Sequence, residues 1–146
     1  MRRGTARREV VIEVPADAVW AAFARPELIH LWFPGIVDCT VDGDERTIHL
    51  ATGMAMAEKI LTNDPTQRRF QYSIAGGLFS EHLGSIDVLA LGPDRSLVTY
   101  ASDVRPAAMA LILGGATQAA LVELRRQLET GTGPLVDALA APARES

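Results

Sequence analysis

The sequence of 146 residues contains a single cysteine, Cys39, and no apolar run of the length that a membrane span requires. One cysteine excludes a disulfide bond within the chain and argues against a thiolate metal site. The most apolar stretch, residues 107–122, contains two glycines, a threonine and a glutamine and stops at Glu123, which is short for a membrane-spanning helix. The N-terminal region also lacks the apolar segment of a signal peptide. We therefore expect a cytoplasmic protein without stable membrane insertion.

Basic residues are fewer than acidic ones, 14 against 18, and the formal net charge is −4. Binding to nucleic acid regardless of its sequence needs a clustered basic surface, so no nucleic-acid partner is expected. The one basic cluster lies at the N-terminus and consists of Arg2, Arg3, Arg7 and Arg8. We interpret it as part of a solvated tail; the alternative is contact with nucleic acid or a membrane.

The first third of the chain predicts a strand followed by two short helices. Residues 8–14 alternate in hydropathy, as in a strand with one buried face, and Pro15 ends this strand. Asp17 can cap the first short helix, and Pro26 suits the first turn of a second helix over residues 27–33.

The middle of the chain changes to a period of two, which is typical of strands. Six further strands are expected, separated by Gly, Pro, Asn and Asp turn signals, over residues 36–42, 46–50, 54–63, 69–74, 79–89 and 96–104. Strands this short, joined by short turns, indicate an antiparallel meander.

A long helix over residues 107–129 is predicted after the last strand. Its apolar side chains recur at helical spacing and form a stripe that we expect to face the sheet: Met109, Ile112, Leu113, Ala116, Ala120, Leu121, Leu124 and Leu128. Gly114 and Gly115 interrupt this helix, and close packing, a bend or room for a ligand would each account for them.

These elements predict an α+β fold in which a curved antiparallel sheet closes over one helix, a shape that often leaves a cavity. A hydrophobic content of 48% over this length supports a single domain with its own core. We place the domain at residues 9–130, with a flexible segment at 1–8 and a C-terminal tail at 131–146 that has room for one helical turn.

The order of elements, together with several local segments, resembles the START-like or SRPBCC superfamily of polyketide cyclase/dehydrase-like and lipid-transport-like proteins. The resemblance covers roughly residues 9–129 and is carried by the segments 11–36, 63–74, 82–88 and 121–129. It implies a helix-grip fold, with seven antiparallel strands wrapped around the C-terminal helix and an apolar cavity between them. The two short helices would close one end. The superfamily has no universal catalytic signature, so the resemblance assigns no catalytic residue.

No metal or cofactor site is expected from the sequence. The three histidines, His30, His49 and His82, lie on separate predicted elements and show no metal-binding spacing. A glycine-rich phosphate loop and a nucleophile elbow are also missing, since Gly114 and Gly115 lie within a helix and the serines lack flanking turn glycines.

We expect the cavity to be lined by Met56, Glu58, Tyr72, His82, Tyr100, Met109 and Leu113. An inward histidine or a buried carboxylate could exchange protons with a ligand, and a tyrosine offers it a ring and a hydroxyl. Methionines adapt to varied apolar shapes. For each of these residues the alternative is an ordinary place in the core or at the rim. Trp32 and Phe33 are candidates for a mobile lid, and the alternative is a fixed hydrophobic plug.

Three functions remain open at this point. The first is binding of a small hydrophobic or amphipathic molecule, such as a lipid, a polyketide or an aromatic compound. The second is a cyclase/dehydrase-type enzyme that uses the same cavity for aldol closure and loss of water. The third and weaker one is a protein-interaction module. A homodimer is also compatible with the sequence.

Overall fold

Seven strands form one antiparallel sheet in the computed structural model, which describes residues 2–141. The strands are β1 (Gly4–Ile12), β2 (Ile36–Asp42), β3 (Glu45–Leu50), β4 (Ala55–Asp64), β5 (Arg69–Ile74), β6 (Glu81–Ala90) and β7 (Ser96–Arg105). Their order across the sheet is β1-β7-β6-β5-β4-β3-β2. Strands β2 to β7 therefore form an antiparallel meander in chain order, and β1 is added at its end beside β7.

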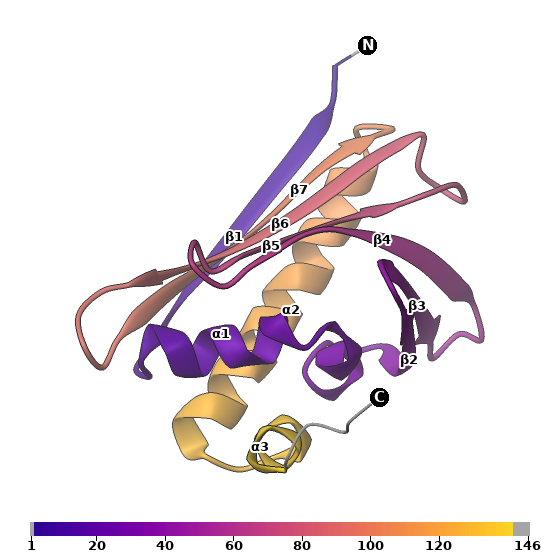
Figure 1. Cartoon of the computed structure of the whole chain (residues 1–146). Helices are drawn as coiled ribbons and strands as arrows, with labels where there is room; N and C mark the ends of the chain where they lie inside the picture. The colour runs from indigo at the N-terminus through magenta and orange to yellow at the C-terminus, as the bar shows by residue number, and fades with distance from the viewer. Residues whose placement is uncertain (1, 142–146) are drawn as a thin grey trace.

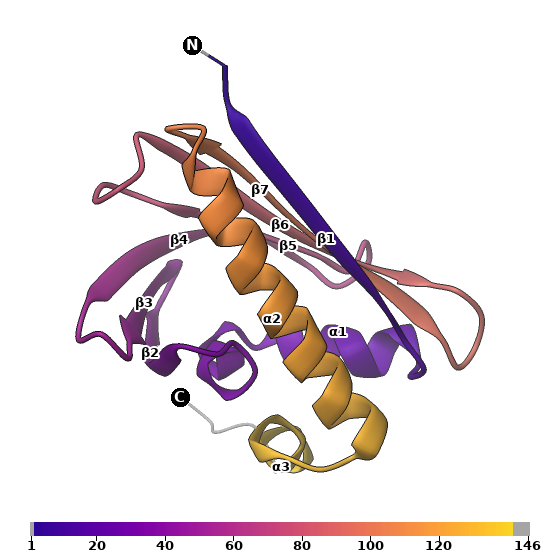
Figure 2. The ribbon, with the colours of Figure 1, turned by 180° about the vertical axis from the view of Figure 1, so that it is seen from behind.

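The sheet curves around the long helix α2 (Met109–Thr130), which crosses its concave face (Figures 1 and 2). Helix α1 (Ala16–Ala24) and the 3₁₀ helix η1 (Pro26–Leu31) lie across one end of the space between the sheet and α2. This is the helix-grip architecture of the α+β class, so the predicted fold is confirmed. None of the helices in residues 2–141 combines the length and the apolar character that crossing a membrane requires.

Alternation along the central strands builds the core. In β7 every second side chain is buried: Ser96, Val98, Tyr100, Ser102 and Val104. Because successive side chains of a strand point to opposite faces, this pattern directs one whole face of β7 toward α2 and the short helices. The other face carries only half-buried residues.

Helix α2 approaches the edge strand β1 closely at Gly114. A Cβ atom at this position would lie 2.7 Å from Nη2 of Arg8 and 3.3 Å from Cβ of Ala6. A side chain at this position would force the Arg8 guanidinium and Ala6 to shift, so close packing accounts for Gly114. A Cβ atom at Gly115 would meet nothing within 4 Å.

In the first half of α2 the predicted apolar stripe is not the most buried face, because Met109, Leu113 and Ala116 are only half-buried. The buried positions there are Ala110, Gly114 and Thr117, whereas Ile112 is 63% exposed. The small residues face the sheet because β1 comes so close. Farther along the helix the prediction is correct, since Ala120, Leu121 and Leu124 are completely buried.

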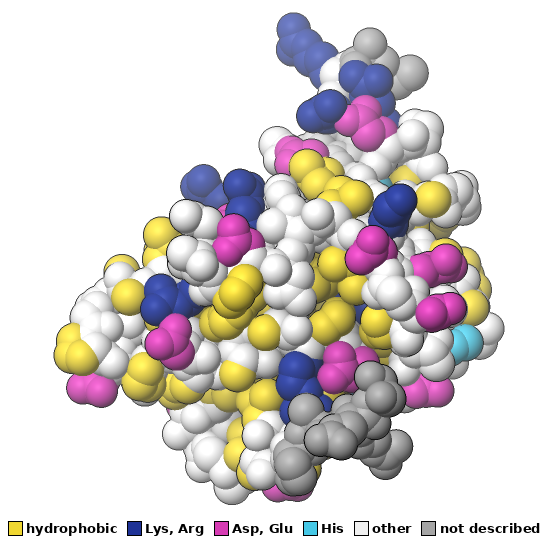
Figure 3. Space-filling model, in the orientation of Figure 1, with side chains coloured by type: hydrophobic (Ala, Val, Ile, Leu, Met, Phe, Trp, Pro, Cys, Tyr) yellow, Lys and Arg dark blue, Asp and Glu magenta, His cyan; other side chains and the backbone are white. Residues whose placement is uncertain are grey.

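The predicted flexible segment 1–8 forms part of a strand from Gly4 onward. Strand β1 begins at Gly4 and pairs with β7 from Gly4 opposite Val104 onward. The N-terminal half of β1 has little hydrophobicity because it lies at the sheet edge, so the pattern of buried strands does not appear there. Lys and Arg side chains gather at this end of the molecule (Figure 3). Residue 1 lies outside the described residues.

The predicted C-terminal tail, residues 131–146, contains a docked helix, α3 (Pro134–Ala140). Helix α2 ends at Thr130, and the next residue, Gly131, turns the chain with a positive φ of 68°. Leu135 of α3 is fully buried. Gln127 of α2 connects this helix to η1 and to α3 through two hydrogen bonds. Its Nε2 donates to the Leu31 carbonyl over 2.8 Å, and its Oε1 accepts the Leu135 N–H over 2.8 Å. Residues 142–146 lie outside the described residues.

We expect Gln127→Ala to lower the free energy of unfolding by about 3 kcal/mol, because it leaves buried backbone groups of Leu31 and Leu135 without partners. Urea denaturation measures this loss. Gln118→Ala, at an exposed position of the same helix, is the matched control and should change stability by less than about 0.5 kcal/mol. Equal effects of the two substitutions would show that Gln127 does not hold α3 in place.

Candidate functional site

A cavity of about 370 Å³ lies between α2 and the strands β3, β4 and β5. The strands contribute Ile48, Leu50, Met56, Glu58, Tyr72 and Ile74. The loop between β5 and β6 contributes Leu78 and Phe79, and α2 contributes Met109, Ile112, Leu113 and Ala116. Residues of η1 and the segment after it, among them Ile29, Phe33 and Pro34, complete the wall.

The cavity lining is apolar except for three side chains, Thr52, Glu58 and Tyr72. Leu78 and Ile112 line the cavity and are each 63% exposed, so its rim toward solvent is apolar as well. A concave apolar space with a few polar groups is the usual form of a small-molecule site.

Glu58 is buried, and the neighbouring strand supplies its counter-ion. Arg46 of β3 is directly opposite Glu58 of β4, so both side chains stand on the same face. The Nε atom of Arg46 donates to Oε1 of Glu58 over 2.6 Å, and each side chain is only 3% exposed. The structure therefore holds a fully desolvated ion pair beside an apolar cavity.

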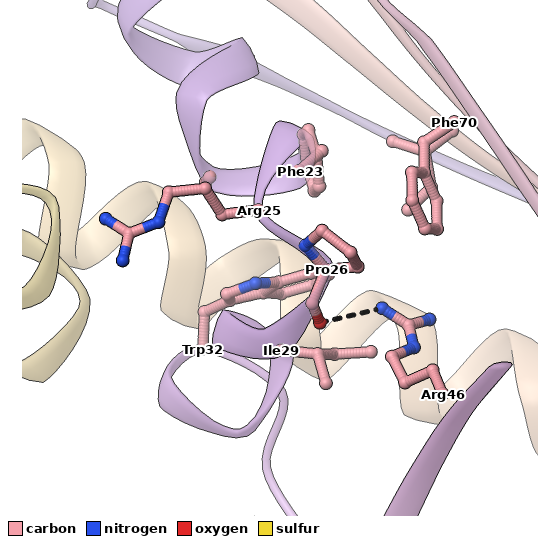
Figure 4. A pocket seen from close by; sticks show the side chains of 9 residues that line it. Phe23, Arg25, Pro26, Ile29, Trp32, Arg46 and Phe70 are labelled. Carbon is pink, nitrogen blue, oxygen red and sulfur yellow. Dashed lines mark hydrogen bonds between the residues drawn. The ribbon is translucent and has the colours of Figure 1, made fainter. Parts of the chain in front are cut away.

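Three further contacts fix the Arg46 guanidinium. Its Nη1 donates to the carbonyl of Pro26 over 3.1 Å (Figure 4). Its central carbon lies 5.3 Å from the ring centre of Phe70 and 5.2 Å from that of Tyr72. Such cation–π contacts favour a guanidinium over a flexible ammonium group at this position.

Burial and pairing act in opposite directions on Glu58. Burial raises the pKa of the Glu58 carboxyl, and the adjacent Arg46 charge opposes that rise. Burial, the largest single influence, lowers the pKa of Arg46. The Glu58 charge, the two neighbouring tyrosines and the hydrogen bond to Glu58 together outweigh it, so the pKa of Arg46 lies above its usual value and the guanidinium stays charged. Oε2 of Glu58 has no hydrogen-bond partner within residues 2–141.

Tyr72 reaches across a neighbouring strand. It is opposite Gly84 of β6, where a Cβ atom would lie 2.6 Å from Cζ of Tyr72, so glycine makes room for the ring. The ring thereby brings its hydroxyl into a hydrogen bond with the Tyr100 hydroxyl on β7. Burial raises the pKa of both tyrosines, which keeps them neutral.

Tyr72 and Tyr100 share one hydrogen bond, and either hydroxyl can donate it. Tyr100 is completely buried, and in the described part of the chain the Tyr72 oxygen is the one hydrogen-bond partner of its hydroxyl. Tyr72 lines the cavity. A ligand oxygen can therefore receive the Tyr72 proton when Tyr100 is the donor within the pair.

Three residues predicted for the cavity or its lid, His82, Tyr100 and Trp32, do not line the cavity. His82 lies behind the cavity wall: its ring centre is 5.3 Å from that of Tyr72 and 5.1 Å from that of Phe79, and its Nδ1 accepts the Ile74 N–H over 3.1 Å. Burial lowers the pKa of His82 to about 4, so it is neutral at neutral pH. Tyr100 supports Tyr72 from behind and does not line the cavity.

Trp32 is buried in the core and does not line the cavity, unlike its neighbour Phe33. It lies instead beside a hollow of only about 10 Å³ that Phe23, Pro26, Ile29, Arg46 and Phe70 also border (Figure 4). A space of this size holds one water molecule at most.

Of the residues predicted for the cavity, Met56, Glu58, Tyr72, Met109 and Leu113 line it. Sequence reasoning missed Arg46 and the loop residues Leu78 and Phe79. Arg46 shares a strand face with Ile48 and Leu50, which was a usable signal of an inward charge. In the loop between β5 and β6, the sequence indicates only a turn at Gly76-Gly77, directly before Leu78 and Phe79.

A groove of about 420 Å³ near the β2–β3 turn is lined mostly by charged residues, Asp42, Asp44, Glu45 and Lys59, with Glu58 at its base. It lacks the apolar walls of the cavity. No group of three or more His, Cys, Asp or Glu side chains in residues 2–141 is arranged to hold a metal ion.

Comparison with known proteins places this geometry among helix-grip proteins. A model of the family described as polyketide cyclase / dehydrase and lipid transport matches residues 3–129. No curated protein matches the chain. Among solved structures, a START superfamily protein from Mycobacterium smegmatis is 15% identical, with a TM-score of 0.75 over 88% of this chain and 99% of that one.

Two other solved structures are similar to this chain. The di-domain ARO/CYC protein BexL of the BE-7585A biosynthetic pathway is 18% identical, with a TM-score of 0.77 over 92% of this chain and 48% of that one. Norcoclaurine synthase from Thalictrum flavum, in complex with dopamine and hydroxybenzaldehyde, is 17% identical, with a TM-score of 0.70 over 90% of each chain. At these identities the likeness shows the fold alone.

We expect Glu58→Gln to lower the free energy of unfolding by about 3–5 kcal/mol, because the Arg46 charge then stays buried without a counter-ion. The double variant Arg46→Met/Glu58→Leu should recover most of this loss, since it removes both charges. Chemical denaturation measures both.

The matched control is Glu13→Gln, which breaks the solvent-exposed pair between Glu13 and Arg95. It should cost less than about 1 kcal/mol. If Glu58→Gln were no more destabilising than this control, the ion pair would not be the buried structural element that its geometry indicates.

Proposed function

The chain belongs to the polyketide cyclase/dehydrase and lipid transport family, and on this premise we propose that it binds one small hydrophobic or amphipathic molecule in the cavity between the sheet and α2. The observation that carries the proposal is the cavity itself, about 370 Å³ of space that the chain's own side chains leave unfilled. That volume lies within the usual range for small-molecule sites. A protein-interaction module that used only its surface would have no need of such a cavity.

Affinity would come mainly from burying the apolar surface of the ligand, at roughly 25 cal/mol per Å². The apolar rim at Leu78 and Ile112 gives such a ligand a favourable path between solvent and cavity. Glu58 and Tyr72 would orient it, because a hydrogen bond inside an apolar space is made only in the correct pose.

The second candidate function is an enzyme of the cyclase/dehydrase type, and Glu58 and Tyr72 favour it. Glu58 would accept a proton from a carbon beside a ketone, while the Tyr72 hydroxyl donates to the ketone oxygen and stabilises the enolate. The enolate carbon would then bond to a second carbonyl of the same chain. Protonation of the resulting alkoxide by Glu58, followed by loss of water, would complete the ring.

For the binding function, we expect the neutral fluorescent probe N-phenyl-1-naphthylamine to bind with one-to-one stoichiometry. Leu113→Trp should weaken this binding at least about tenfold, because the indole fills the cavity that the probe needs. Leu111→Trp is the matched control, since Leu111 is 80% exposed on the same helix and lies outside the cavity lining. Equal affinities of the two variants, measured by fluorescence titration, would place the probe elsewhere.

For the enzyme, we expect the wild-type protein to convert a short poly-β-ketone thioester to a product that has lost one water, detected by mass spectrometry. Tyr72→Phe should lower the rate by about 10²-fold, because the enolate oxygen loses its donor. Binding of N-phenyl-1-naphthylamine, which needs no such donor, should stay within about twofold. A wild-type rate equal to the uncatalysed one would eliminate this reaction and leave the binding function.

A further inference from the structure

We propose that the cavity selects ligands whose buried end is an uncharged hydroxyl group donating a hydrogen bond to Oε2 of Glu58, so that alcohols and phenols bind and carboxylates of the same shape do not. This inference rests on the proposed binding function and adds to it the chemical class of the ligand and its orientation.

The first observation is the single charge in the cavity wall. Glu58 is the one charged residue among those that line the cavity. Its Oε1 is occupied by the Arg46 Nε–H over 2.6 Å, whereas Oε2 takes no hydrogen bond from any residue between 2 and 141. A buried carboxylate oxygen can accept more than one hydrogen bond, so this atom has unused capacity beside an apolar space.

The second observation is the position of Arg46. It does not line the cavity, because its side chain is held by the Pro26 carbonyl and the rings of Phe70 and Tyr72 and borders the separate small hollow. A ligand therefore meets the negative member of the pair first. A carboxylate at this place would face a like charge in a poorly solvated space, where repulsion is strong.

An ammonium group fits the site less well than a hydroxyl. The Glu58 charge is already balanced by Arg46, so a cation would give up its hydration to reach a pair with no net charge. An uncharged hydroxyl loses far less hydration. Its hydrogen bond to an ionised acceptor is also stronger than one between two neutral groups.

The polar wall also determines orientation. Glu58 and Tyr72 come from strands β4 and β5, whereas the exposed apolar rim residues Leu78 and Ile112 belong to the β5–β6 loop and α2. The hydroxyl end therefore enters first, and the apolar body of the ligand lies against α2 and the rim.

The experiment compares four probes with one aromatic body: naphthalene, 2-naphthol, 2-naphthoate and 2-naphthylmethylammonium, titrated into the wild-type protein at pH 7. We expect 2-naphthol to bind about tenfold or more tightly than naphthalene, because one hydrogen bond to a charged acceptor is gained. We expect 2-naphthoate to bind more weakly than naphthalene, and the ammonium probe to bind more weakly than 2-naphthol.

The variant arm uses Arg46→Met/Glu58→Leu, which removes the acceptor without leaving a buried charge. In this protein 2-naphthol and naphthalene should bind within about threefold of each other, since the hydroxyl then has no charged partner. Circular dichroism confirms that the variant is folded; if it is not, the four wild-type titrations decide the question alone.

The outcomes separate the two proposals. Wild-type binding of 2-naphthoate or of the ammonium probe as tight as that of 2-naphthol would overturn the selectivity and leave the binding function intact. Equal binding of naphthalene and 2-naphthol would do the same. Failure of all four probes, and of N-phenyl-1-naphthylamine, to bind would contradict the binding function itself.

Discussion

The buried ion pair between Arg46 and Glu58 is the constraint on which the rest of this molecule depends. Two charges at 3% exposure are tolerated only when each finds partners, and here the neighbouring strands, the Pro26 carbonyl and two aromatic rings supply them. The pair links the outer strands β3 and β4 to the chain at the start of η1. It also sets the chemistry of the cavity, because Glu58 lines the cavity and Arg46 does not.

Two faces of helix α2 have different surroundings: one packs closely against β1, and the other lines the cavity. One face carries small residues, with Gly114 against Arg8 and Ala6 of β1, and this brings the helix close to one side of the sheet. The other face, with Met109, Leu113 and Ala116, lines the cavity on the side of β3, β4 and β5. Close packing on one side and a cavity on the other follow from a curved sheet held around a straight helix, since the two surfaces cannot be in contact everywhere.

Much of the cavity lining could be predicted from the sequence, and two of the errors, His82 and Tyr100, share one cause. Met56, Glu58 and Tyr72 were placed correctly because alternation along a strand assigns each side chain to a face. His82 and Tyr100 share the inward face but lie behind Tyr72, whose ring leans over Gly84. Alternation reports which face a residue occupies, and it does not report which of several inward residues covers the others.

The sequence by itself determined the element order, the antiparallel sheet and the long helix, because these follow from local periodicity and turn chemistry. The tertiary structure alone decided how β1 and α3 dock, where the cavity opens and which atom of Glu58 remains free. These features depend on contacts between residues far apart in the chain, such as Gln127 with Leu31 and Leu135, or Arg46 with Pro26. Local sequence patterns contain no information about contacts between distant residues, so these features become visible only in the folded chain.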